Sequence, residues 1–121
     1  MAGGTKCSSA FKIAHEHILA NYASDSHDVY VYEFSDGDNF MSDNIICVEY
    51  IQKLLSLCKA IGYGEIILDD TRPWMQEENL LSNVFNESIN RTRFVSTQLT
   101  SRDDVFVALK KFFNIKTVDF E

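Results

Sequence analysis

Hydrophobic and polar residues alternate along the chain in blocks whose spacing switches between the helical and the strand period. Apolar residues recur at helical spacing from Ser8 to about Tyr22, which predicts an amphipathic helix capped by Ser8 or Ser9. β-Branched and aromatic residues then follow in nearly continuous series over Val29–Phe34. That pattern is typical of a strand buried on both faces.

A polar turn over residues 35–43 leads to a second helical block. We expect a helix from about Asp43 to Ile61, with Ser42 as its N-cap and Gly62 as its stop. This helix would contain two of the three cysteines, Cys47 and Cys58. Residues 64–69 then form a second short strand.

The last third of the chain repeats the alternation. It predicts a weaker helix over about residues 76–85, a strand over Arg93–Leu99 and a helix from about Asp103 to Phe113. Ser101 and Asp104 have the spacing of a capping box. The order αβαβαβα predicts a three-layer α/β fold, with a parallel sheet of about three strands covered by helices. Residues 1–121 would form a single domain.

Composition narrows the class of protein. No stretch approaches the roughly 18 apolar residues of a membrane span, so we expect a cytoplasmic protein with no membrane partner. The three cysteines, an odd number at wide spacing, indicate buried free thiols rather than a zinc site. The net charge is -7 and the basic residues are scattered, which argues against a nucleic acid partner.

Candidate chemistry lies where the strands end, because ligands of parallel sheets bind beyond the carboxyl ends of the strands. The polar residues after the first strand are Ser35, Asp36, Asp38 and Asn39, and Asp69 and Asp70 follow the second. Thr5 precedes the first helix and would lie beside Asp36. Such oxygen ligands suit Mg²⁺ or Mn²⁺. An ordinary polar turn explains the same residues without a ligand.

Three blocks of sequence carry a family resemblance, which spans essentially the whole chain. They are Gly3-Gly4-Thr5-Lys6-Cys7-Ser8-Ser9-Ala10, Tyr32-Glu33-Phe34-Ser35-Asp36-Gly37-Asp38-Asn39 and Ile61-Gly62-Tyr63-Gly64-Glu65. In these blocks the chain resembles the C-terminal portion of the YhbH/YeaH sporulation and stress protein family, which is itself similar to von Willebrand factor A domains. The resemblance implies the C-terminal half of such a domain, hence a partial domain in this chain.

The resemblance also implies a metal-ion-dependent adhesion site. That site takes an Asp-x-Ser-x-Ser loop, a Thr and an Asp; Thr5 matches the second element and Asp36 the third, whereas the first element is absent from this sequence. Two oxygen ligands hold Mg²⁺ or Mn²⁺ weakly or not at all, so tight binding is expected only in the intact protein. Ser35, Asp38 and Asn39 would support the site.

Partners follow from the same comparison. The missing N-terminal half would supply a strand beside Val29–Phe34, and without it the exposed sheet edge would favour a homodimer. The resemblance further implies a bacterial setting in sporulation or stress response, beside a PrkA-type serine protein kinase system.

We therefore expect a non-catalytic protein-interaction or regulatory module. The alternative is a Mg²⁺-dependent phosphoryl-transfer or phosphoesterase enzyme that uses Asp36, Asp38 and Asp69, with Arg72 or Lys6 for the phosphate. A third interpretation is a purely structural fragment with a solvated acidic loop.

Overall fold

The computed structural model describes residues 6–22, 26–37, 39, 41–67, 80–89 and 93–115. Its elements are α1 (Cys7–Asn21), β1 (Tyr30–Ser35), α2 (Met41–Leu55), β2 (Ala60–Ile66), α3 (Leu81–Ser88), β3 (Phe94–Leu99) and α4 (Asp104–Phe113). The predicted order αβαβαβα is confirmed.

The three strands form one parallel sheet in the order β1-β2-β3. Residues Tyr30–Ser35 of β1 align with Ala60–Glu65, and Ile61–Ile66 of β2 align with Phe94–Leu99. Six consecutive residues of the central strand β2 are buried, whereas none of β1 is. The predicted parallel sheet is confirmed, and β1 is a terminal strand of the sheet that the structure describes.

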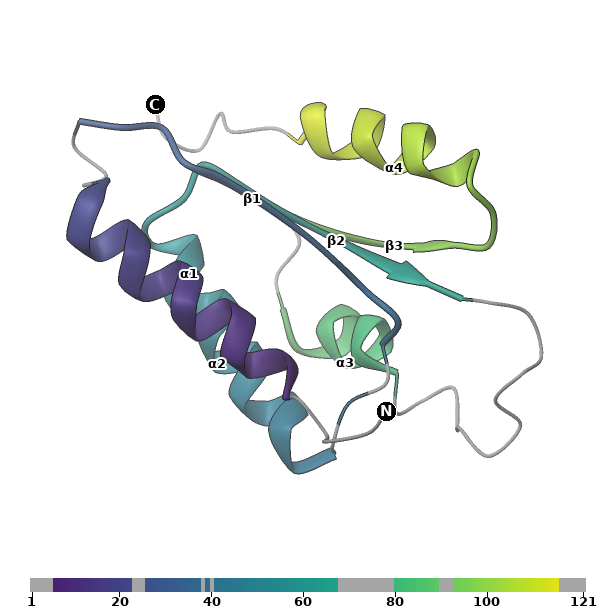
Figure 1. Ribbon diagram of the computed structural model, residues 1–121, viewed down its shortest axis with the longest axis horizontal. Coiled ribbons are helices and arrows are strands. Elements are labelled where there is room, and N and C mark those ends of the chain that lie inside the picture. Colours follow the sequence, from purple (N-terminus) through teal and green to yellow (C-terminus); the bar gives the residue numbers. More distant parts are fainter. Residues whose placement is uncertain are drawn as a thin grey trace.

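Helices cover both faces of this sheet (Figure 1). Helices α1, α2 and α3 lie on one face and α4 on the other, which confirms the three-layer arrangement. The larger core contains Phe11, Ile18, Cys47, Ile51, Leu54, Cys58, Ile61, Tyr63, Leu81, Phe85, Ile89 and Phe94. The smaller core, beneath α4, contains Leu99, Ala108 and Phe112.

Aromatic rings organise the larger core. The ring of Phe85 on α3 meets the rings of Phe11, Tyr63 and Phe94 edge to face, with centroids 6.1, 5.1 and 5.4 Å away. Such edge contacts add to the free energy gained from burying the rings alone. The short helix α3 is thereby joined to α1, β2 and β3.

The boundary between α2 and β2 differs from the prediction. The helix ends at Leu55, not near Ile61, and the strand already begins at Ala60, so Gly62 lies inside the sheet and does not stop the helix. Arg93 supplies a physical reason, because its Nη1 atom donates to the carbonyl oxygens of Leu55 and Cys58, each at 2.8 Å. These bonds satisfy carbonyl groups at the end of α2 that a longer helix would have used.

The cysteines are free thiols, as predicted, but Cys58 lies after α2 and not within it. Cys47 and Cys58 are buried and Cys7 is half-buried. Burial raises the pKa of Cys58 to about 11, which keeps that thiol protonated and inert at neutral pH.

Two predicted helix caps are wrong. The N-cap of α1 is Lys6, without a side-chain hydrogen bond, and Ser42 lies inside α2. At α4 the capping box is half formed: Asp104 Oδ2 accepts the Ser101 amide at 3.1 Å, although the N-cap itself is Asp103. The predicted residues 76–79 of α3 lie outside the described residues.

Candidate functional site

The carboxyl ends of the three strands share one edge of the sheet, and Asp36 follows β1 at that edge as an exposed residue. Its predicted companion Thr5 lies outside the described residues, as does Asp38. The acidic pair after β2, Asp69 and Asp70, and the phosphate-binding candidate Arg72 lie outside them too. The pairing of Thr5 with Asp36 therefore stays a prediction.

The start of α1 is bound to the segment that follows β1. The backbone amide of Cys7 donates to Asn39 Oδ1 at 3.1 Å. The amide of Ser8 donates to Asp43 Oδ2 at 3.0 Å, and the Ser8 hydroxyl donates to Asp43 Oδ1 at 2.6 Å. Residues far apart in sequence thus cap α1, whose own N-cap residue, Lys6, has no side-chain acceptor for the helix amides.

Asp43 is a buried carboxylate, 1% exposed, in the first turn of α2. Burial alone would raise its pKa, but the hydrogen bonds from Ser8, Asn39 and Cys47 outweigh that effect and lower its pKa below the ordinary value. The positive ends of two helices further favour its charge. Asp43 is therefore ionised at neutral pH and joins α1 to α2.

Asn39 uses both ends of its amide in this cluster. Its Oδ1 atom accepts from Cys7, while its Nδ2 atom donates to Asp43 Oδ2 at 3.1 Å and to Asn44 Oδ1 at 2.8 Å. The side chain thereby fixes the approach to α2. This engagement indicates a scaffolding part for Asn39 at the edge where Asp36 lies.

A second network crosses the same edge around Glu65, which is 0% exposed. Its Oε1 atom accepts the Ser82 amide at 2.9 Å and the Tyr63 hydroxyl at 3.2 Å. Its Oε2 atom accepts the Ser82 hydroxyl and Gln98 Nε2, the latter at 3.2 Å. Four donors around one buried carboxylate satisfy it without a cation, and the Ser82 amide bond caps the start of α3.

The Glu65 network continues to the residues that flank Asp36. The Tyr63 hydroxyl lies 2.5 Å from Ser35 Oγ, which accepts the Gly37 amide at 3.1 Å. Gly37 has a φ of +77°, and a Cβ at this position would overlap the Glu65 carboxylate. Glycine is therefore required both by the backbone conformation and by the space.

Neither Glu65 nor Asp43 was identified as a site residue from the sequence. The usable signal for Glu65 is a lone carboxylate in the otherwise apolar strand Ala60–Ile66. For Asp43 no such signal exists, since an acidic residue in the first turn of a helix is ordinary.

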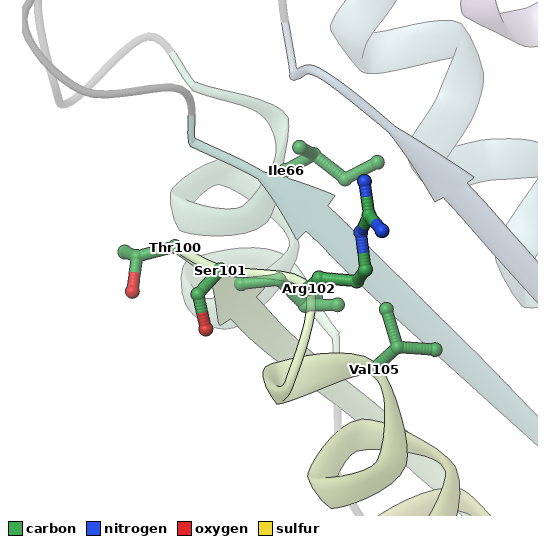
Figure 2. A pocket seen from close by; sticks show the side chains of 6 residues that line it. Ile66, Thr100, Ser101, Arg102 and Val105 are labelled. Atoms are coloured by element: carbon green, nitrogen blue, oxygen red, sulfur yellow. The ribbon is translucent and has the colours of Figure 1, made fainter.

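Among the residues that the structure describes, two pockets open at the β3 side. One, of about 320 Å³, lies between the strand ends and α4; in Figure 2 the Arg102 side chain extends toward Ile66 from the start of that helix. Its lining is Ile66, Leu99, Thr100, Ser101, Arg102 and Val105. The other, of about 260 Å³, is polar and is lined by Ser82, Asn83, Asn86, Ser96, Thr97 and Gln98. Ser82 and Gln98 thus belong to both the polar pocket and the Glu65 network.

Within the described ranges, no three His, Cys, Asp or Glu side chains gather closely enough to hold a metal ion. Among the same residues, no helix has the length and apolar character needed to cross a membrane.

Comparison with known proteins shows which family the chain belongs to. Residues 1–116 match the family described as "Protein of unknown function (DUF444)". The chain belongs to this DUF444 family. Its membership agrees at the coarse level with the resemblance to YhbH/YeaH proteins, while the likeness to von Willebrand factor A domains stays a prediction.

Relatives of this DUF444 chain include UPF0229 proteins of Bacillus cereus (strain B4264), Bacillus thuringiensis (strain Al Hakam) and Bacillus anthracis (strain A0248). Each is 38% identical over 112 residues, which cover 93% of this chain and 27% of the relative. The chain therefore spans about a quarter of the length of these relatives. No solved structure matches it.

Proposed function

We propose that this chain is a non-catalytic interaction module that contributes Asp36 and Thr5 to a metal-ion-dependent adhesion site of a longer protein. The observation that supports this proposal is the attachment of α1 to the segment after β1, through Cys7 to Asn39 and Ser8 to Asp43. Because of that attachment, Cys7 and Ser8, which follow Thr5 closely in the sequence, are held against the segment that follows Asp36.

The donor chemistry fits a hard divalent cation. Asp36 offers an exposed carboxylate and Thr5 a hydroxyl, both oxygen ligands of the kind that Mg²⁺ and Mn²⁺ prefer. When bound, such a cation would offer an open coordination position to an acidic side chain of a partner. Ser35 and Asn39 already bond within the fold and would position the site, with Asp38 as a further candidate.

The setting is part of the same proposal. We place the longer protein in bacterial sporulation or stress response, with a PrkA-type serine protein kinase system as its functional neighbour, and in the cytoplasm. The segment missing from this chain would bring the Asp-x-Ser-x-Ser element of the site.

Calorimetric titration with Mg²⁺ and Mn²⁺ tests the metal site. It is performed on this chain and on a form extended upstream to include an Asp-x-Ser-x-Ser strand. We expect binding in the extended form and weak or no binding in the shorter one. Asp36→Ala should weaken binding at least about tenfold, since even outer partners of metal ligands contribute about 10- to 100-fold.

The matched control is Asp103→Ala, which removes an exposed carboxylate at the start of α4. It should leave the affinity unchanged. Equal affinity of the Asp36→Ala and wild-type extended forms would contradict the proposal, and metal-dependent hydrolysis of a phosphoester would favour the enzyme alternative.

A further inference from the structure

The motif Gly62-Tyr63-Gly64-Glu65 lies in the central strand, and the proposed adhesion site gives it no part. It places one buried carboxylate and one buried phenol directly under the segment that follows β1. Burying polar groups of this kind costs free energy unless each of them is hydrogen-bonded. Two such groups with all their hydrogen bonds formed therefore fix the geometry around them.

Tyr63 and Glu65 hold both neighbours of Asp36. On one side the Tyr63 hydroxyl lies 2.5 Å from Ser35 Oγ, and on the other the backbone of Gly37 rests against the Glu65 carboxylate. The Gly37 amide donates to the same Ser35 oxygen at 3.1 Å, which closes the turn. Asp36 itself is exposed between these two anchored residues.

The donors run in one direction. The Gly37 amide donates to Ser35 Oγ, the Ser35 hydroxyl can then donate to the Tyr63 oxygen, and the Tyr63 hydroxyl donates to Glu65 Oε1. A carboxylate at the end of such a chain accepts every bond and leaves no donor unpaired. On its far side Glu65 binds the amide and hydroxyl of Ser82, at the start of α3.

We infer that Tyr63 and Glu65 are positioning residues that fix the Asp36 carboxylate at the sheet edge and tie it to the start of α3. This inference rests on the proposed function for its metal readout, but the anchoring of the Asp36 turn is measurable without a metal. A conservative substitution separates the hydrogen bond made by the Tyr63 hydroxyl from the packing of its ring. Tyr63→Phe keeps the ring that packs on Phe85 and removes only the hydroxyl.

Amide hydrogen exchange of the 121-residue chain measures the anchor. In Tyr63→Phe we expect the Gly37 amide to exchange at least about fivefold faster, the factor that corresponds to a hydrogen bond worth about 1 kcal/mol. Amides of α4 should be unaffected. The matched control Tyr32→Phe removes a phenol on the opposite face of the sheet, beside Phe112, and should leave Gly37 protected.

Mn²⁺ affinity of the extended form is the second readout. Tyr63→Phe and Glu65→Gln should weaken it at least about tenfold, in line with other outer partners of metal ligands, while Tyr32→Phe should not. If the Gly37 amide exchanges equally fast in Tyr63→Phe and wild type, the Tyr63 hydroxyl does not anchor the Asp36 turn. If Mn²⁺ affinity is unchanged in both variants, Tyr63 and Glu65 do not position the Asp36 carboxylate for the metal. Absence of Mn²⁺ binding in the wild-type extended form overturns the proposed function instead. The hydrogen exchange data then still test whether Tyr63 anchors the Asp36 turn.

Discussion

The Ser8 hydroxyl donates to Asp43 Oδ1 at 2.6 Å, so a carboxylate from the start of α2 caps the start of α1. The same carboxylate accepts the Ser8 amide. Bonds from neutral donors to a buried charged acceptor are stronger than those between neutral groups. These two hydrogen bonds therefore join the starts of the two helices.

Asp43→Ala should destabilise the chain by about 2–3 kcal/mol, because it removes buried hydrogen bonds to a charged group and leaves the Ser8 donors unpaired. Urea unfolding followed by circular dichroism measures the loss. The matched control Glu49→Ala alters an exposed acidic residue of the same helix and should change stability by less than about 0.5 kcal/mol. Equal losses in the two variants would refute the assignment of Asp43 as a cap.

The contribution of Asp43 should depend on pH with a definite sign. Its pKa is lower in the folded than in the unfolded chain, where it is about 3.9, so unfolding takes up protons in acid. The stabilisation is thus present above about pH 4 and is lost as the pH falls through the folded-state pKa. The stability difference between wild type and Asp43→Asn should shrink from pH 7 to pH 3; a constant difference would contradict this linkage.

Gly62→Ala should loosen α4 from the sheet. A Cβ at position 62 would overlap the ring of Phe112, which is 1% exposed. Overpacking of this kind costs about 1–3 kcal/mol. The second substitution Phe112→Leu, in the Gly62→Ala background, should restore part of that loss by making room, as judged by thermal unfolding. If the double variant is as unstable as the sum of the single ones, the overlap is not the cause.

The outer edge of β1 should pair with a second copy of the chain when the predicted upstream strand is absent. Tyr30 is 51% exposed at the start of this strand, and Phe113, which touches Tyr32, is 68% exposed. We expect a dimeric mass in light scattering at micromolar concentration. Tyr30→Lys should give a monomer, since an edge lysine opposes strand pairing.

The control Tyr22→Lys alters a tyrosine that is 42% exposed, is the C-cap residue of α1 and is not part of β1. It should remain dimeric. A monomeric wild-type chain would rule out pairing through β1 under these conditions.

The sequence predicted the elements well but not what joins them. Hydrophobic periodicity located β3 and α4 to within a residue, whereas the apolar run through Leu54, Leu57, Cys58 and Ile61 continued the helical pattern past the true end of α2. Arg93 ends that helix from a distant part of the chain, and a local pattern carries no record of such a contact.

In the candidate site, too, the sequence predicts local features but not contacts between residues distant in sequence. Asp36 was predicted from its place after a predicted strand, which needs only the alternation of elements. Glu65 was missed because its donors come from β3, from α3 and from its own strand, and they meet only once the sheet has formed. The pairing of Thr5 with Asp36 remains to be tested by the titrations.

Long-range capping also bears on how the chain acquires its structure. Helices α1 and α3 both begin at residues without a local side-chain cap, and each is capped by a carboxylate from another element. A peptide of the 15 residues of α1 would lack that carboxylate and should be largely unstructured in water. Secondary and tertiary structure should therefore form together, in one cooperative step governed by contacts distant in sequence.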